Sequence, residues 1–392
     1  MTGMKICIIG SVYPRHPSDT EVPWLRETVN RCRAAGLDIC VFAPSFRGIG
    51  THVVDGVTVH RFRYFFSRWE TLTHEEGAPN KIHKLHYKFI TLSYLLFGTL
   101  GLIRLHVTRR FDILHVHWPA PHALFALAAI LFRRAKLVLT FHGAELLLVN
   151  KYPFVRPLLR FFIGRADGVT ANSRFTAGRI RSIRDCDVRV IPYGTTLGTR
   201  TPAAKPAGSP PAILSAGRMI ERKGFEYLVR AMPLVRKSLP DAVLTMVGGG
   251  PLENGLRQLA SDLHLEKAVR FTGKISPGEL ERLFVECDAF ALPAVVDRRG
   301  DTEGLGVVLI EAFSYGKPAV ASDVGGIPDL VINEKTGLLV PQKDPQALAG
   351  ALIRILSDRE LANRLGQAAF EHVRKSYCWE TIVARLMEVY GG

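Results

Sequence analysis

Two glutamates, Glu303 and Glu311, are the side chains of this 392-residue sequence with the clearest potential for chemistry. They lie eight residues apart in the stretch Asp301–Pro318, which reads DTEGLGVVLIEAFSYGKP. On one ideal helix they would stand roughly 12 Å apart along the axis. That is too far for the paired carboxylates of a glycoside hydrolase, which are about 5 to 9 Å apart. The spacing suits a ligand with hydroxyls at both ends and a charged middle, such as a nucleotide sugar.

The turn between the two glutamates adds a possible anion site. A helix predicted to begin near Gly306 would present unpaired backbone amides at its start, where the helix dipole also favours negative charge. The glycines let a ligand approach the main chain closely. The predicted amide donors are Gly304, Leu305, Gly306 and Val307.

The wider context EGLGVVLIEAFSYGKPAVAS resembles the Glu-x7-Glu motif of a large family of retaining, metal-independent glycosyltransferases, family GT4. Members have the GT-B architecture, with two Rossmann-like domains facing a cleft. The resemblance implies that Glu303 and the amides after it hold the sugar of the donor. It also implies that Glu311 accepts hydrogen bonds from the ribose.

Other donor-binding residues follow from the same resemblance. In the turn Gly217–Gly224, Arg218 and Lys223 match the cations that grip the donor diphosphate. Two fixed cations can stabilise the charge that builds on a departing nucleotide, which is the role of a metal elsewhere. Further candidates are Gly249 and Gly250, in a glycine turn, and Ile275, in a loop similar to the family's base-contacting loop.

Two histidines at predicted strand ends are candidates in the first half. FDILHVHWP and LTFHGAE resemble family signatures and contain His117 and His142. By that match His142 lies beside the donor sugar, where a neutral imidazole can bond a hydroxyl and stabilise a charged transition state. His117 is placed on the acceptor side; a single histidine at a strand end is more often structural.

The loop after the first predicted strand lacks the adjacent glycines found in many family members. It contains instead a Ser-Asp-Thr sequence, similar to a Ser-Glu-Thr variant of some polysaccharide-assembly relatives. Acceptor contact and simple solvation are equally compatible with its polar side chains. The candidates on the acceptor side are Arg15, His16, Ser18, Asp19 and Thr20.

The elements that must position these residues alternate between strands and helices. The pattern predicts an α/β protein with two doubly wound parallel sheets, whose ligand crevices lie at the carboxyl ends of the strands. A Gly- and Pro-rich segment without periodicity marks the boundary. We expect a first domain over residues 1–200, a linker over 201–211, a donor domain over 212–375, and a final helix in 376–392 that crosses back.

Charge divides the sequence unevenly. Residues 1–200 contain 28 Lys and Arg against 13 Asp and Glu, whereas residues 201–392 contain 23 of each. All of the net charge of +15 therefore lies in the first half. A basic half favours an anionic partner: a phosphate-bearing acceptor, an acidic membrane surface or nucleic acid.

A long helical region is predicted over Lys81–Arg110, basic at its start and apolar from Phe89 to Ile103. These fifteen apolar residues fall short of the roughly 18–20 that span a bilayer. The helix is expected to be buried in the first domain, or to meet anionic lipid headgroups along its basic edge. The two interpretations are compatible if separate faces serve each purpose.

The remaining signals favour a cytoplasmic protein without a cofactor. The six cysteines have no metal-ligand spacing, and Met4–Gly10 is a short strand rather than a signal segment. Asp185-Cys186-Asp187 matches a metal-binding Asp-x-Asp pattern, but its place before a short strand argues against that role. We expect no metal.

Taken together, the sequence predicts a retaining hexosyltransferase that uses a nucleotide-diphosphate sugar. The acceptor is expected to be anionic or lipid-linked, as in lipopolysaccharide or polysaccharide assembly at the cytoplasmic membrane face. The alternatives are a nucleotide-sugar 2-epimerase, which acts on the donor alone, and a phosphorylase, which would need a longer chain. A nucleic-acid-binding protein fits the charge, but the sequence has no motif for that function.

Overall fold

The computed structural model describes residues 3–19, 21–74, 81, 84–195 and 208–391. Its contacts divide the chain into two compact units. Unit 1 comprises Met1–Asn172, Thr176–Ile191 and Ile382–Gly392, and unit 2 comprises Ser173–Phe175 and Pro192–Thr381. The last helix, α14 (Trp379–Gly391), therefore begins in unit 2, and its residues from Ile382 onward group with unit 1.

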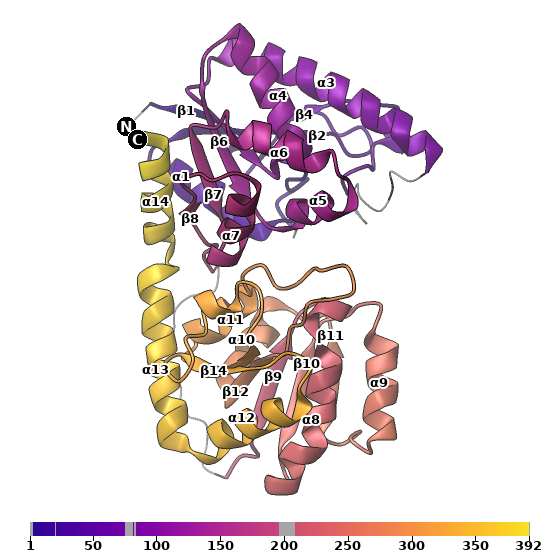
Figure 1. Cartoon of the computed structure of the whole chain (residues 1–392), viewed down its shortest axis with the longest axis vertical. Coiled ribbons are helices and arrows are strands. Elements are labelled where there is room, and N and C mark those ends of the chain that lie inside the picture. Colours follow the sequence, from indigo (N-terminus) through magenta and orange to yellow (C-terminus); the bar gives the residue numbers. More distant parts are fainter. Residues whose placement is uncertain (1–2, 20, 75–80, 82–83, 196–207, 392) are drawn as a thin grey trace. The chain divides into compact units, whose positions relative to one another are not determined.

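Unit 1 is built on a sheet whose described strands follow the order β3-β4-β2-β1-β5-β6-β7-β8 (Figure 1). The strands are β1 (Lys5–Ile9), β2 (Asp38–Pro44), β3 (His52–Val54), β4 (Val57–Phe62), β5 (Ile113–His117), β6 (Lys136–Phe141), β7 (Gly168–Ala171) and β8 (Arg189–Val190). All pairs are parallel except β3–β4, a short antiparallel hairpin at the edge. The expectation of a wholly parallel sheet was wrong there, because the tight Asp55-Gly56 turn returns the chain directly.

The helices of unit 1 cover both faces of this sheet, as doubly wound folds require. They are α1 (Pro23–Ala34), α3 (Leu85–Arg109), α4 (Pro119–Phe132), α5 (Leu148–Lys151), α6 (Val155–Ile163) and α7 (Arg174–Ile183). Helix α3 packs against α4, and α4 packs against α6. Gly98 lets α3 approach the core closely, since a Cβ there would lie 2.6 Å from the Phe125 ring.

Helix α3 corrects the expected length of the apolar region. It has 25 residues and, within the part of the chain that is described, is the one helix long and apolar enough to cross a membrane by length and composition. Only one narrow stripe of it is buried, at every fourth residue: Ile90, Tyr94, Gly98, Leu102 and His106. Because α3 is buried along this stripe alone, most of its apolar side chains lie outside the core.

Unit 2 carries a second sheet, and over its described residues the order is β11-β10-β9-β12-β13-β14 with every pair parallel. The strands are β9 (Ala212–Ala216), β10 (Val243–Val247), β11 (Val269–Gly273), β12 (Ala289–Leu292), β13 (Ala319–Ser322) and β14 (Gly337–Val340). The helices are α8 (Phe225–Ser238), α9 (Glu253–Asp262), α10 (Pro277–Glu286), α11 (Val307–Ser314), α12 (Pro345–Ser357) and α13 (Arg359–Ser376).

Strand order reverses between β9 and β12 in unit 2. Chain order runs outward from β9 through β10 to β11 on one side, and from β12 through β13 to β14 on the other. In open α/β sheets such a switch point opens a crevice at the carboxyl ends of the strands, because the two following loops leave in opposite directions. The fold thus predicts that a ligand site lies over the loops after β9 and β12.

Candidate functional site

The loops after β9 and β12 meet through a buried ion pair. Lys223 lies in a short 3₁₀ turn, Glu221–Lys223, and donates through Nζ to the Glu303 carboxylate. The Arg222 guanidinium lies 3.4 Å from the same Glu303 oxygen and also lies 3.5 Å from the Asp301 carboxylate. Burial opposes the charge of Glu303, but the Lys223 ammonium and the Arg222 guanidinium outweigh it and hold its pKa below the usual value. Glu303 is therefore ionised at neutral pH.

Arg222 is a residue that the sequence reasoning missed. Its neighbours in the turn, Arg218 and Lys223, were selected by family match, and Arg222 reads as a surface cation. The signal available was the acidic pair Asp301 and Glu303, which needs more than one cation once buried. Arg218 itself is exposed, so the structure leaves its side chain accessible at the mouth of the same turn.

Glu311 sits on α11, and its environment differs from that of Glu303. Burial raises the pKa of Glu311 to about 7, with Lys223 opposing the rise. The two carboxylates therefore both experience the Lys223 ammonium, one as a direct partner and one through space. A carboxyl of this kind is half-ionised at neutral pH and gains by accepting hydrogen bonds from a ligand.

The ideal-helix estimate of the distance between the two glutamates does not apply to this structure. Helix α11 covers only Val307–Ser314, so Glu303 lies in the loop before it and the rise of a continuous helix does not apply. Gly306 is the residue before the helix and has a left-handed backbone, φ 87°. It turns the chain back, so the Gly306 N–H lowers the pKa of Glu303 by hydrogen bonding.

A pair of glycines after β13 packs against the backbone of the turn Glu303–Gly306, which carries the predicted amide donors. A Cβ at Gly325 would lie 2.1 Å from the carbonyl oxygen of Glu303, and one at Gly326 would lie 2.1 Å from that of Gly304. Gly326 also donates its N–H to the Glu303 carbonyl at 2.9 Å. These glycines were missed by the sequence reasoning, although adjacent glycines after a strand were a usable signal. Their close packing and the Gly326 hydrogen bond fix the position of the turn that carries Gly304, Leu305 and Gly306.

The predicted glycine turn after β10 serves a similar purpose. A Cβ at Gly250 would lie 2.5 Å from the carbonyl oxygen of Met219, and Gly249 accepts a backbone hydrogen bond from Met219 at 3.0 Å. This turn therefore packs against the loop that carries Arg218. Ile275 follows β11 and is half-buried at the edge of the core. The structure thus gathers the predicted donor residues of unit 2 on one edge of one sheet.

Unit 1 contains the second group of candidates, a pair of histidines. His117, at the end of β5, and His142, just after β6, share a hydrogen bond of 3.0 Å between Nδ1 and Nε2, and their rings stack 5.2 Å apart. Trp24 and Trp118 contact the His142 ring at 4.6 and 4.8 Å. Burial lowers the pKa of His142 to about 3 and that of His117 well below its usual value. Both rings are neutral at pH 7.

The two histidines are held in different ways. Within the described residues, the Nε2 atom of His117 is buried without a hydrogen-bond partner. The backbone of His142 is held at both ends, since its N–H donates to Glu145 at 2.7 Å and its carbonyl accepts from Asn172 at 3.2 Å. Burial raises the pKa of Glu145 to about 7. The Nε2 atom of His117 is therefore unpaired among the described residues, whereas His142 is held in place by its backbone and holds the His117 ring through their shared hydrogen bond.

A hydrogen-bond chain supports these histidines from behind. His115 Nδ1 bonds the Tyr390 hydroxyl at 2.8 Å, and His115 Nε2 bonds the Thr140 hydroxyl at 2.6 Å, which continues to Thr170. The rings of His115 and His117 lie 4.4 Å apart. The last turn of α14 thereby contributes a side chain to the layer under the histidine pair.

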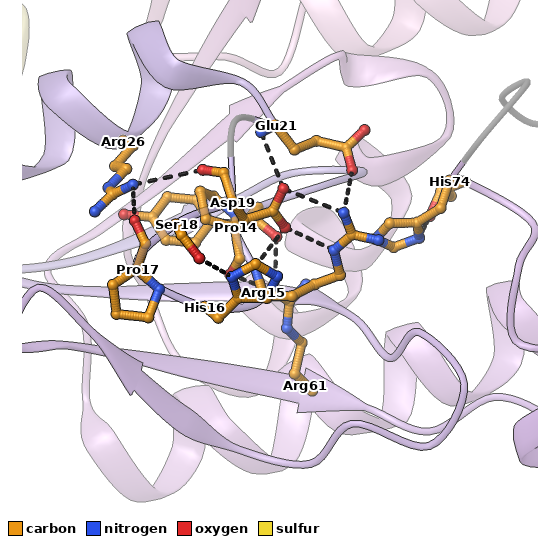
Figure 2. Close-up of polar contacts among 12 residues, drawn as sticks. Pro14, Arg15, His16, Pro17, Ser18, Asp19, Glu21, Arg26, Arg61 and His74 are labelled. Carbon is orange, nitrogen blue, oxygen red and sulfur yellow. Dashed lines mark hydrogen bonds and ion pairs between the residues drawn. The ribbon is translucent and has the colours of Figure 1, made fainter. Parts of the chain in front are cut away.

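The loop after β1, which carries the predicted acceptor-side candidates, is tied together by its own charges (Figure 2). Figure 2 shows Arg15 between two carboxylates, bonded to Asp19 at 2.6 Å and reaching Glu21 at 3.8 Å. Arg61 is buried and donates to the carbonyls of Tyr13, Pro14 and Pro44. His16 and Ser18 are exposed and bond each other at 2.9 Å. Thr20 lies outside the described residues.

The described side chains offer no metal site. Across the residues that it describes, no group of three His, Cys, Asp or Glu side chains is close enough to hold an ion. Asp187 of the Asp-x-Asp pattern lies instead 4.0 Å from Arg189.

Comparison with known proteins matches both halves of the chain to family models. Residues 24–198 match the model of glycosyltransferase family 4, and residues 201–372 match that of the glycosyl transferases group 1. A GDP-mannose-dependent alpha-(1-6)-phosphatidylinositol monomannoside mannosyltransferase of Mycobacterium tuberculosis is 34% identical over 285 residues, which cover 70% of this chain and 74% of that protein. An N-acetyl-alpha-D-glucosaminyl L-malate synthase of Bacillus anthracis is 29% identical, covering 71% and 74%.

Solved structures show the same fold. A sucrose-phosphate synthase of Thermosynechococcus elongatus superposes with a TM-score of 0.77 over 99% of this chain and 98% of the other, at 23% identity. The Anabaena protein HepE, solved in complex with UDP-glucose, gives a TM-score of 0.72 over 99% of each chain at 17% identity. The two sheets described above are thus the two Rossmann-like domains of the GT-B fold.

Proposed function

Because the chain belongs to glycosyltransferase family 4 and transfers sugar from a nucleotide sugar, we propose that it is a retaining, metal-independent hexosyltransferase with a lipid-linked acceptor. The observation that carries the proposal is the Lys223–Glu303 pair over the switch point of unit 2. A cation and an acid at that point, next to an amide turn, can hold the phosphate and the sugar of one donor.

The two cations of the β9 loop act on the leaving group. As the bond between sugar and phosphate breaks, negative charge grows on the nucleotide diphosphate, and Lys223 and Arg218 stabilise it. Lys223 is already fixed by its ion pair, so little reorganisation accompanies the reaction. No metal is needed for this step in the proposal.

The acids and the histidines orient the sugar. Glu303 and the amides of the turn bond its hydroxyls, while Glu311 accepts hydrogen bonds from the ribose. The neutral rings of His117 and His142 contact the sugar from the acceptor side, where a neutral imidazole donates or accepts without adding a competing charge. The acceptor hydroxyl attacks from the leaving-group face and gives its proton to the departing phosphate, so the anomeric configuration is retained.

An anionic, lipid-linked acceptor at the cytoplasmic membrane face completes the proposal. The basic excess of residues 1–200 supports it, as does the M. tuberculosis relative, whose named acceptor is a phosphatidylinositol glycolipid. The same relative supports GDP-mannose as the first donor to test. The relatives found are transferases and synthases, so the epimerase alternative gains no support.

A donor panel tests the function directly. GDP-mannose, UDP-glucose, UDP-N-acetylglucosamine and ADP-glucose are each added to the protein, and the melting temperature is measured, since a bound donor stabilises the folded state by mass action. One donor should raise the melting temperature in the wild type and fail to do so in Lys223→Met. Release of nucleotide upon addition of a phosphatidylinositol mannoside then reports transfer. If no donor shifts the melting temperature, the proposal fails.

A further inference from the structure

The outer face of α3 is apolar and open. Phe89, Leu92 and Leu96 are 64%, 67% and 54% exposed, and Phe97 and Leu100 beside them are about half exposed. Exposed apolar residues scattered singly are ordinary, but a row along one helix is not. This helix therefore presents a continuous apolar face that no described residue covers.

The neighbouring helices of unit 1 also expose apolar side chains. Helix α4 packs beside α3 (Figure 1). Its last two residues, Leu131 and Phe132, are 86% and 67% exposed. Helix α6, packed on α4, adds Phe161, which is about half exposed. We call the exposed faces of α3, the end of α4 and α6 the three-helix face. All of it belongs to unit 1.

The charges on this segment are mostly positive. Residues 84–165 contain twelve Lys and Arg but only two acids, Asp112 and Glu145. Glu145 is buried, and Asp112 accepts a backbone hydrogen bond from Lys5. The basic side chains at the ends of the helices are exposed, among them Lys88, Arg104, Arg133 and Arg134. Positive charge therefore exceeds negative charge around the exposed apolar side chains, although Asp112 and Asp167 lie near Leu131.

Two other occupants fit these observations less well. A second copy would place this basic face against another basic face, which is repulsive. A membrane-spanning helix would have to leave its packing, because the buried stripe of α3 is held by the Tyr94–His122 bond of 2.8 Å and the bond of 2.9 Å from His106 to the Arg133 carbonyl. Helix α3 is fixed along unit 1, so it lies on a surface rather than across it.

We propose that the three-helix face docks unit 1 onto an anionic lipid bilayer, with the α3 side chains entering the headgroup region and the flanking Lys and Arg bonding lipid phosphates. The proposal rests on the proposed function for its purpose, because a lipid-linked acceptor must be met at the bilayer. The place of the docking surface on unit 1 is inferred from the exposed apolar and basic side chains alone.

Vesicle co-sedimentation with the full chain tests this, using phosphatidylcholine vesicles with and without phosphatidylglycerol. We expect binding to the anionic vesicles that weakens with salt. The triple variant Phe89→Ser/Leu92→Ser/Leu96→Ser should lose at least about tenfold in partitioning, since each side chain loses apolar burial. Its matched control carries the same number of apolar-to-Ser changes at exposed positions of unit 2, Leu234→Ser/Leu252→Ser/Ile332→Ser, and should bind as the wild type does.

Charge reversal tests the electrostatic contribution to vesicle binding separately from the apolar one. Arg133→Glu/Arg134→Glu should weaken binding to anionic vesicles by roughly fivefold or more per residue. The matched control, Arg374→Glu/Lys375→Glu on α13, should not. Equal binding by the α3 triple variant and its control would overturn the proposal. So would a concentration-dependent dimer of the wild type that the triple variant abolishes, which would assign the face to a second copy.

Donor turnover keeps this test apart from the proposed function. Slow release of nucleotide from the donor in detergent, without vesicles, should be the same in the wild type and the α3 triple variant. If the wild type binds anionic vesicles through α3 but no donor is ever turned over, the docking surface stands and the proposed function falls. If turnover is normal and vesicles are not bound, the docking surface falls alone.

Discussion

Donor affinity should depend on pH through Glu311. Its pKa is raised to about 7 by burial, from an ordinary value of 4.5. A carboxylate that accepts hydrogen bonds from two ribose hydroxyls must be ionised to do so, and at pH 6 only about a tenth of the free protein has it ionised, against about nine-tenths at pH 8. The dissociation constant should therefore fall by roughly tenfold from pH 6 to pH 8, and binding at pH 7 should release about half a proton.

Isothermal titration calorimetry measures both quantities, the dissociation constant from the titration and the proton from the dependence of heat on the buffer. Glu311→Gln should bind the donor more weakly at pH 8 and show no slope between about pH 6 and 8, where the diphosphate diester of the donor does not titrate. Glu360→Gln, an exposed glutamate on α13, is the matched control and should keep the slope. The reasoning is refuted if Glu311→Gln keeps the wild-type slope, or if the wild type has none.

Three further changes test other parts of the site. Lys223→Met should lower the free energy of unfolding by about 3 kcal/mol in urea titration, because Glu303 would be buried without its counter-charge, and Glu303→Gln added to it should restore part of the loss. Gly326→Ala places a Cβ 2.1 Å from a carbonyl oxygen of the amide turn and should weaken donor binding at least about tenfold, whereas Gly255→Ala, with open space around it, should not. His117→Gln should reduce kcat by about a hundredfold with little change in donor dissociation constant, as separate kinetic and calorimetric measurements would show; a loss confined to donor affinity would contradict this role.

The grouping of the candidate residues in unit 2 was largely predictable because those residues are local in sequence. Glu303, the amides and Glu311 fall within nine residues, and Lys223 lies in a strand-to-helix turn that the pattern of strands locates. Arg222 escaped prediction because its role depends on Asp301, which is distant in sequence and meets it only when β9 and β12 become neighbours.

Packing decided the features that the sequence left open. An apolar helix with all faces alike reads as buried, and only the structure shows that α3 uses one stripe of side chains to pack, such as Leu102, and leaves Phe89 and Leu92 outside. The roughly 12 Å expected between Glu303 and Glu311 assumed one ideal helix through both residues, and only Glu311 lies on α11. A helix was predicted to begin near Gly306, and α11 does begin at Val307, directly after the left-handed backbone of Gly306.

The hydroxyl of Tyr390 makes the far end of α14 a structural member of unit 1 rather than a tail. It bonds His115, which sits under the histidine pair, and Lys136 reaches the Tyr390 carbonyl at 3.4 Å. Proteolytic trimming from Ile382 onward would therefore strip a hydrogen bond out of the interior and open that layer to water. Loss of a few distal residues should register as a change in the environment of buried imidazoles, well before the molecule loses its secondary structure.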